Sequence, residues 1–191
     1  MEQNKEEVAG RYTFRLSRQE DVPRIMEIFE EAKSIMRENG NLTQWVDGYP
    51  SEGVLLEDIA LGNSYVVIDP TSKSIVGTFA CIAGEEPTYR TIYEGQCLDD
   101  SLPYVTIHRL ASTAASHGVA YTVFDFVLSE FYHTASHISN HASPISIRID
   151  THRDNTIMRH LLLAYGFSYC GIIYLNSGAE RLAYQCLLQQ P

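Results

Sequence analysis

The chain has 191 residues, of which 45% are hydrophobic, and a formal net charge of -10. Such a length suits one domain with a complete hydrophobic core. The acidic balance, without a basic stripe anywhere in the sequence, argues against a nucleic acid as partner.

The ends and the cysteines of the chain bear on its cellular setting. Residues 1–10 are polar and lack the apolar core segment of a signal peptide, so we expect a disordered tail there. The longest apolar helix contains Asp125 and Glu130, which argues against a membrane span. The four cysteines form no C-x-x-C pair: Cys81, Cys97, Cys170 and Cys186. Reduced thiols in a cytoplasmic protein are the expected result.

Hydrophobic periodicity and turn residues predict strands and helices throughout residues 11–191, which we expect to form a single domain. The expected strands are Tyr12–Leu16, Ser64–Asp69, Ile75–Ala83, Tyr104–Ser112, Ile145–Asp150, Ser168–Leu175 and Arg181–Leu188. The expected helices are Glu20–Glu38, Ser51–Leu61, Val119–Thr134 and Asp154–Ala164. A helical crossover makes the two strands around the third helix parallel, whereas hairpins join most of the others. This order predicts an α/β fold with a mixed, mostly antiparallel sheet and helices on both faces.

The segment between the fourth strand and the third helix is the most informative one. An apolar run ends at Ala111, small residues follow, and Gly118 and Ala120 open the helix. A strand, a small-residue loop and a helix start direct backbone N–H groups at an anion, usually a phosphate. Loops of this composition also simply turn the chain, with Gly118 relieving strain. The segment alone leaves both interpretations open.

Three pieces of sequence, in order and at matching spacing, resemble the GNAT superfamily of acyl-CoA-dependent N-acyltransferases. The first is segment 109–120, RLASTAASHGVA, which lies at the family's diphosphate loop. The second is Asn155 with Met158, at the start of the family's penultimate helix. The third is Gly166-Phe167, at the end of that helix. The resemblance covers about residues 12–188 and implies a GNAT-like domain.

The resemblance implies an N-acetyltransferase that uses acetyl-CoA as co-substrate, needs no metal, and acetylates a primary amine of a small molecule or peptide by direct attack. Loop amides would hold the diphosphate of coenzyme A, helped by the helix dipole. Leu110 and Ser112 would offer backbone groups to the pantetheine arm. The implied cofactor-binding residues are Leu110, Ala111, Ser112, Ser116, His117, Gly118, Val119, Ala120, Tyr121, Asn155 and Met158.

Two positions depart from the family's pattern. Ala115 replaces the usual Arg or Gln, which predicts weaker cofactor binding or compensation by His117 and the loop amides. Leu162 stands where the family often has a tyrosine that protonates the departing thiolate. Tyr165, one turn further along nearly the same helix face, is the substitute candidate for this acid. A tyrosine that only packs at the helix end is the alternative.

The acceptor side is less defined. Trp45 and Tyr49 lie in an aromatic, turn-rich stretch that forms one wall of the acceptor pocket in the resembling fold, and Tyr93 is a third candidate for amine contact. Alternatively, Trp45 closes the edge of the core. Glu94, in the acidic loop 85–102, is the candidate general base. The alternative is a solvated loop without a catalytic role.

Several alternatives stay open. A catalytically silent acyl-CoA sensor or partner-binding module on the same fold is favoured by Ala115 and Leu162, and another nucleotide binder is a weaker possibility. The acceptor could be a polyamine, an amino acid, an antibiotic or a protein amine. The last hairpin leaves a strand edge for a possible homodimer. His133, His137 and His141 recur at helical spacing, but the helix should end before the last of them, so no metal site is expected.

Overall fold

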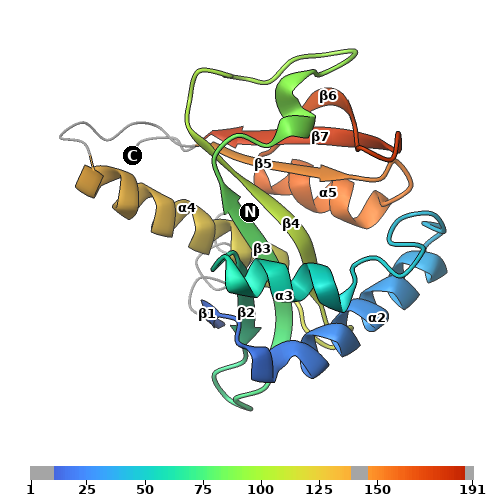
Figure 1. Cartoon of the computed structure of the whole chain (residues 1–191), viewed down its shortest axis with the longest axis vertical. Coiled ribbons are helices and arrows are strands. Elements are labelled where there is room, and N and C mark those ends of the chain that lie inside the picture. Colours follow the sequence, from blue (N-terminus) through green and yellow to red (C-terminus); the bar gives the residue numbers. More distant parts are fainter. Residues whose placement is uncertain (1–10, 139–145, 188–191) are drawn as a thin grey trace. The chain divides into compact units, whose positions relative to one another are not determined.

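The computed structural model describes residues 11–138 and 146–187, and its elements follow the predicted order (Figure 1). The strands are β1 (Thr13–Leu16), β2 (Ser64–Ile68), β3 (Ile75–Ala83), β4 (Tyr104–Ser112), β5 (Ser146–Thr151), β6 (Ser168–Tyr174) and β7 (Glu180–Leu187). The α-helices are α2 (Val22–Glu38), α3 (Glu52–Ala60), α4 (Val119–Ile138) and α5 (Thr156–Tyr165), with 3-10 turns η1 (Gln19–Asp21) and η2 (Pro87–Arg90).

The strands form a seven-stranded sheet in the order β1-β2-β3-β4-β5-β7-β6. Antiparallel pairing joins β1 to β2, β2 to β3, β5 to β7 and β6 to β7. β4 and β5, the two strands that α4 connects, pair in parallel, as the helical crossover requires. The predicted mixed, mostly antiparallel sheet is confirmed.

The chain divides into two compact units. Unit 1 takes Met1–Cys81 and His108–Val123, and unit 2 takes Ile82–Ile107 and Phe124–Pro191. Both β3 and β4 pass from one unit to the other. The expectation of a single domain stays a prediction.

In unit 1, helices cover both faces of the sheet. The core on one face joins α2 and α3 to Val66 of β2 and Ala111 of β4. Successive strand residues point to opposite faces, so Val67 faces away from that core. Val67 pairs with Gly77, where an added Cβ would lie 3.0 Å from a methyl group of Val119 on α4. The first turn of α4 therefore packs on the opposite face, as predicted.

In unit 2, buried polar side chains hold the long loop between β3 and β4. The Arg148 side chain, 3% exposed, donates to the Asp100 carboxylate at 2.8 Å and lies 3.9 Å from the centroid of the Tyr104 ring. Gln185 is fully buried and accepts from the N–H of Leu98 at 2.7 Å. The predicted irregular loop thus has a fixed course and contains η2.

Local capping sets the ends of α5 where the sequence predicts them. The Asn155 side chain accepts a hydrogen bond from the N–H of Met158 at 3.0 Å, and Gly166 ends the helix at a φ of 119°. The predicted end of α4 at Thr134 is wrong by one turn, because the helix continues to Ile138. His141 and the predicted tail, residues 1–10, lie outside the described residues.

Within residues 11–138 and 146–187, no helix has the length and apolarity to cross a bilayer. Over the same ranges, no group of three or more potential His, Cys, Asp or Glu ligands is placed to hold a metal ion. All four cysteines are buried and free of disulfides, as the sequence predicts.

Candidate active site

In unit 1, a tight turn connects β4 to α4. The N–H of Thr113 donates to the carbonyl of Val76 at 2.9 Å, and the N–H of Ser116 donates to the carbonyl of Thr113 at 3.1 Å. The hydroxyl groups of Thr113 and Ser116 are 2.8 Å apart in a second hydrogen bond. The small-residue loop is therefore held by its own polar groups at the edge of the sheet.

Gly118 turns the chain into α4 with a left-handed φ of 76°. The hydroxyl of Tyr12 on the N-terminal side donates to the carbonyl of His117 at 3.0 Å. The N–H of Thr122 donates to the carbonyl of Gly118, so helical bonding starts there and the N–H groups of the first turn point ahead of α4. This turn carries no acidic residue. The start of α4 is thus suited to hold an anion.

β4 leaves its parallel partner before it ends. The β4–β5 register stops at Ile107 and Ile149, whereas β4 continues to Ser112. Arg109 has a φ of 52°, which is rare for a residue other than glycine. Leu110 and Ser112 are two residues apart and therefore direct their backbone groups to the same strand edge. Ala111 between them is buried in the α2–α3 core, so only its backbone is available to a ligand.

A buried ion pair anchors the turned part of β4 to α3. The Nη2 atom of Arg109 is 2.8 Å from both carboxylate oxygens of Asp58, and the two side chains are 11% and 9% exposed. Burial raises the pKa of Asp58, and the neighbouring Arg109 opposes that rise. Sequence reasoning missed this pair. The signal lies in the spacing of Leu55, Asp58 and Ile59, which places the carboxylate on the apolar face of its helix.

The predicted aromatic wall lies beside this ion pair. The Nη1 atom of Arg109 donates to the Tyr49 hydroxyl at 3.2 Å. The Trp45 ring packs edge-on against Phe29 and Tyr49, with centroid distances of 5.5 and 6.5 Å. Trp45 is half-buried on the α2 core whereas Tyr49 is exposed. Trp45 therefore closes the core edge, and Tyr49 offers the accessible aromatic surface.

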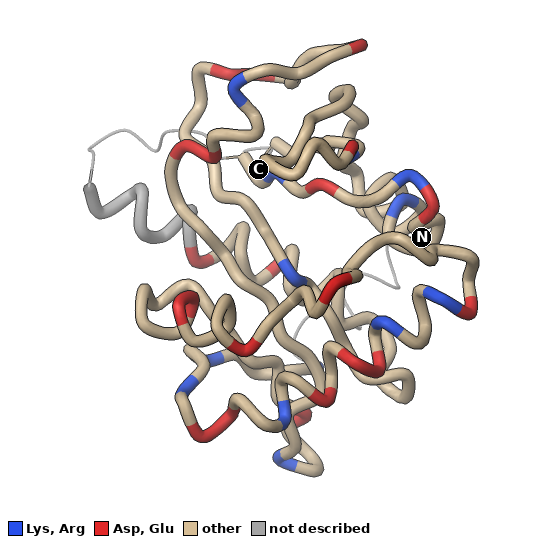
Figure 2. The backbone as a smooth tube through the Cα atoms, turned by 45° about the vertical axis from the view of Figure 1, so that its right-hand side comes forward, with Lys and Arg blue, Asp and Glu red and all other residues tan. Residues whose placement is uncertain are grey.

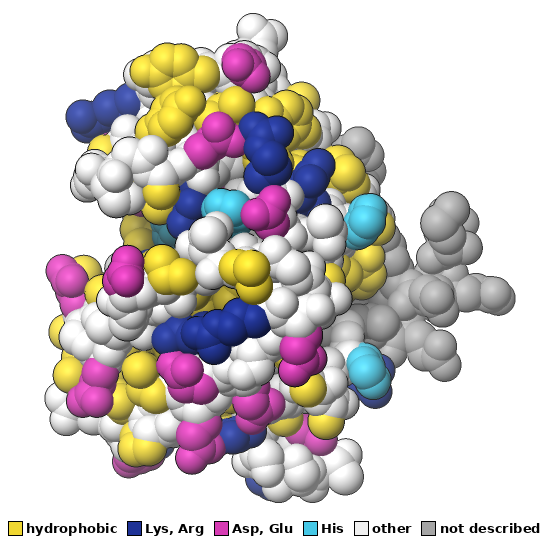
Figure 3. Space-filling view, turned by 90° about the vertical axis from the view of Figure 1, so that its right-hand side faces the viewer, with side chains coloured by type: hydrophobic (Ala, Val, Ile, Leu, Met, Phe, Trp, Pro, Cys, Tyr) yellow, Lys and Arg dark blue, Asp and Glu magenta, His cyan; other side chains and the backbone are white. Residues whose placement is uncertain are grey.

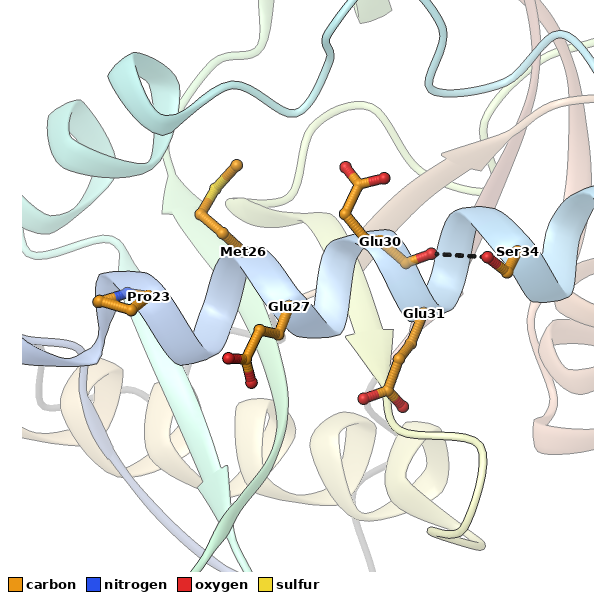
Figure 4. A pocket seen from close by; sticks show the side chains of 6 residues that line it. All are labelled: Pro23, Met26, Glu27, Glu30, Glu31 and Ser34. Atoms are coloured by element: carbon orange, nitrogen blue, oxygen red, sulfur yellow. Dashed lines mark hydrogen bonds between the residues drawn. The ribbon is translucent and has the colours of Figure 1, made fainter.

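An open groove of about 620 Å³ runs along α2, also in unit 1 (Figure 4). Its lining residues all belong to this helix: Pro23, Met26, Glu27, Glu30, Glu31 and Ser34. The Glu31 carboxylate accepts from the N–H of Ala114 at 3.4 Å and lies 3.7 Å from Arg24. A negative charge therefore sits beside the loop that leads to α4. Sequence reasoning missed this contact between distant segments.

If the start of α4 binds the diphosphate of coenzyme A, as the sequence predicts, Glu31→Gln should strengthen that binding about threefold, because a repelling charge is removed at a partly exposed site. Glu38→Gln, an exposed carboxylate at the C-terminal end of the same helix, is the matched control, since Glu30 holds the buried Lys33 at 2.6 Å. Calorimetric titration with coenzyme A measures both. Equal coenzyme A affinities for the two variants would show that the charge of Glu31 does not act on a bound anion.

In unit 2, the candidate acid Tyr165 is held by α4. Its hydroxyl donates to the Asp125 carboxylate at 2.6 Å, and its ring packs edge-on against Phe124 at 4.9 Å between centroids. Burial, followed by the hydrogen bond to Asp125, raises the pKa of Tyr165 well above its usual range. Leu162, at the family's tyrosine position, is fully buried. Asn155 caps α5 through Met158, so both have a structural role whatever they bind.

The acidic loop of unit 2 uses most of its carboxylates internally. Glu85 pairs with a neighbouring arginine, Glu86 caps η2, Asp99 caps a turn, and Asp100 pairs with Arg148. Glu94 is exposed and has a φ of 55°. Glu94 is therefore kept as the candidate base of this loop, and its role as base stays a prediction.

Tyr93 joins this loop to the edge of β6. Its N–H and carbonyl exchange hydrogen bonds of 2.8 Å with Ile172, and its exposed ring packs edge-on against Tyr174 at 5.3 Å. The edge expected to receive a second copy is thus already paired at Ile172. A homodimer stays a prediction, as does an amine contact by Tyr93.

Charged residues are dispersed along the backbone of each unit (Figure 2). On the face shown in Figure 3, basic, acidic and hydrophobic side chains are interspersed. That face offers no continuous basic surface of the kind that binds a nucleic-acid backbone.

Comparison with known proteins identifies the family. No family model matches the chain, and no curated protein matches it. A GNAT-family acetyltransferase from Streptococcus agalactiae 2603 is 30% identical, with a TM-score of 0.71, over 94% of this chain and 96% of that one. The chain belongs to the GNAT family of acetyltransferases.

More distant structures share the fold. A GNAT-family acetyltransferase from Listeria monocytogenes 4b F2365 is 18% identical with a TM-score of 0.61, over 93% of this chain and 95% of that one. Spermidine N-acetyltransferase from Vibrio cholerae, solved in complex with CoA and spermine, is 16% identical with a TM-score of 0.59, over the same shares of the two chains.

Proposed function

We propose that this protein transfers an acetyl group from acetyl-CoA to a primary amine of a small molecule or peptide. Family membership supports acetyl transfer, and the loop at Gly118 supports coenzyme A as the donor. The spermidine N-acetyltransferase of the same fold was solved with CoA and a polyamine, which supports an amine acceptor. The observation that carries the proposal is the start of α4, where Gly118 has a φ of 76° and the first turn has no acidic residue.

Unit 1 supplies the groups that would bind the donor. The amides from Ser116 to Tyr121 are the proposed diphosphate contacts, although the Ser116 amide also closes the turn to Thr113. Leu110 and Ser112 would pair with the pantetheine amides as an added strand does. Tyr12 engages the carbonyl of His117, and the exposed side chain of His117 is a proposed contact to the donor. The backbone amides and His117 would therefore have to replace the contacts of the Arg or Gln side chain that Ala115 lacks.

Catalysis would come mainly from proximity and orientation. The acceptor amine loses a proton, for which Glu94 is the proposed base, and then attacks the thioester carbonyl. The acetyl–sulfur bond breaks as the new amide forms, and solvent supplies the proton to the leaving thiolate. Tyr49 forms the proposed amine wall in unit 1, with Trp45 packed against it at the core edge, and its ring face favours a cationic or apolar amine.

Two assays test this function together. Calorimetry with acetyl-CoA measures binding, and release of free thiol over a panel of polyamines, amino acids, aminoglycosides and peptides measures transfer. We expect binding with thiol release on at least one amine. Absence of acetyl-CoA binding would contradict the proposal.

A silent acyl-CoA sensor is the second candidate, and the burial of Leu162 at the family's tyrosine position favours it. A sensor predicts tight acetyl-CoA binding without thiol release on any amine in the panel. The same assays therefore separate the two functions.

We expect Tyr165→Phe to lower kcat by less than about threefold, because the hydroxyl proton is committed to Asp125 and a raised pKa makes a poor acid. The free energy of unfolding should fall by about 2 kcal/mol with the lost hydrogen bond to a charged group. Tyr169→Phe, on exposed β6 surface, is the control. A loss in kcat above about 100-fold at unchanged stability would instead make Tyr165 the general acid.

A further inference from the structure

The backbone of β4 is turned at one non-glycine residue. Arg109 adopts a φ of 52°, two residues beyond Ile107, which makes the last β4–β5 pair. Side chains rarely adopt this conformation, because Cβ crowds the neighbouring carbonyl oxygen. Such an outlier persists only where surrounding contacts over-determine it. The contacts that hold Arg109 are therefore of functional interest.

Two side chains of unit 1, Asp58 and Tyr49, make those contacts. The Arg109 guanidinium is 2.8 Å from both Asp58 oxygens and donates to the Tyr49 hydroxyl at 3.2 Å. Asp58 belongs to α3, which is capped by Ser51 and packs through Leu55 into the α2 core. A buried carboxylate on a rigid helix thus fixes the direction of the Arg109 side chain, and with it the backbone to which that side chain belongs.

The residue after Arg109 is the one that matters for the proposed reaction. Rotating the Arg109 backbone to negative φ would reorient the peptide group that carries the N–H of Leu110. That N–H lies on the strand edge where we propose that the pantetheine arm binds. In the proposed function, the loop at Gly118 and the start of α4 would hold the diphosphate through separate contacts.

We propose that Asp58 is a positioning residue for acetyl transfer, which acts through its ion pair with Arg109 to aim the Leu110 amide at the acyl donor. This inference rests on the proposed function. It predicts that loss of the ion pair lowers kcat and leaves coenzyme A affinity almost unchanged. Small misplacements of reacting groups are costly in rate, whereas the proposed diphosphate contacts come from a different segment, the start of α4, and should keep most of the affinity.

Two double variants test the inference. Asp58→Asn with Arg109→Gln removes both buried charges and keeps a side chain that resists positive φ. Asp58→Asn with Arg109→Gly removes the same charges but accepts positive φ without strain. We expect the Gln variant to lose about 20-fold in kcat and the Gly variant to stay within about fivefold of wild type. Coenzyme A dissociation constants should stay within about threefold in both.

Glu57→Gln, an exposed neighbour on α3, is the control for surface charge. A purely structural role of the ion pair predicts the opposite order, because glycine packs less and lowers stability more than glutamine. Equal kcat values for the two double variants, or a lower kcat for the Gly variant, would overturn the inference. If wild type neither binds acetyl-CoA nor releases thiol, the proposed function itself fails, and this result is separate from the comparison of variants.

Discussion

Replacing Gly118 with valine is expected to weaken coenzyme A binding about 30-fold, equivalent to about 2 kcal/mol, while the protein stays folded. Gly118 has a φ of 76°, a conformation that a β-branched residue adopts only with strain. Relief of that strain would turn the first amides of α4 away from the diphosphate. Calorimetry with coenzyme A measures the loss, and circular dichroism checks the fold.

Gly118→Asn is the matched control, because asparagine tolerates the left-handed region and keeps the backbone direction. We expect it to bind coenzyme A more tightly than the valine variant does. Pantetheine, which lacks the diphosphate, should bind wild type and the valine variant equally. Undiminished coenzyme A affinity in Gly118→Val would remove the basis of the proposed donor site.

Gln185→Leu should lower the free energy of unfolding by about 3 kcal/mol, because buried polar groups would lose their partners. The Gln185 oxygen accepts from the N–H groups of Leu98 and Asp99 at 2.7 and 3.2 Å. Its nitrogen donates to the carbonyl of Asp99 and the hydroxyl of Ser146, both at 2.9 Å. Leucine has a similar size but can make none of these four bonds.

Urea unfolding followed by circular dichroism measures this change. Gln96→Leu, at an exposed position of the same loop, should alter stability by less than about 0.5 kcal/mol. If both substitutions have the same small effect, water replaces Gln185 without loss, and the loop does not depend on this side chain.

Features set by neighbouring residues were predictable from sequence. Asn155 and Gly166 limit α5 by local hydrogen bonds and by a left-handed backbone, and such signals act within one turn of helix. The parallel pairing of β4 and β5 follows from the helical crossover between them. The predicted end of α4 is too early because the polar residues Ser136 and His137 suggest a break, and polarity alone does not stop a helix that lacks a capping glycine or proline.

Features made by distant residues were not predictable in the same way. Arg109 and Asp58 are 51 positions apart, so their pairing depends on how α3 packs against the sheet. The contact of Glu31 with Ala114 likewise joins α2 to a loop 83 positions away. In contrast, the loop at Gly118 was recognised because its strand, small residues and helix start are contiguous. The candidate diphosphate loop could therefore be predicted from the sequence, whereas the contacts that support it could not.

Backbone amide shifts in the wild-type protein test the central claim most directly. Coenzyme A and pantetheine would be titrated separately into ¹⁵N-labelled protein. If the start of α4 holds a diphosphate, coenzyme A shifts the amide signals of Gly118, Val119 and Ala120 strongly, and pantetheine leaves them nearly in place. Coenzyme A binding that leaves these three signals unmoved would contradict the account.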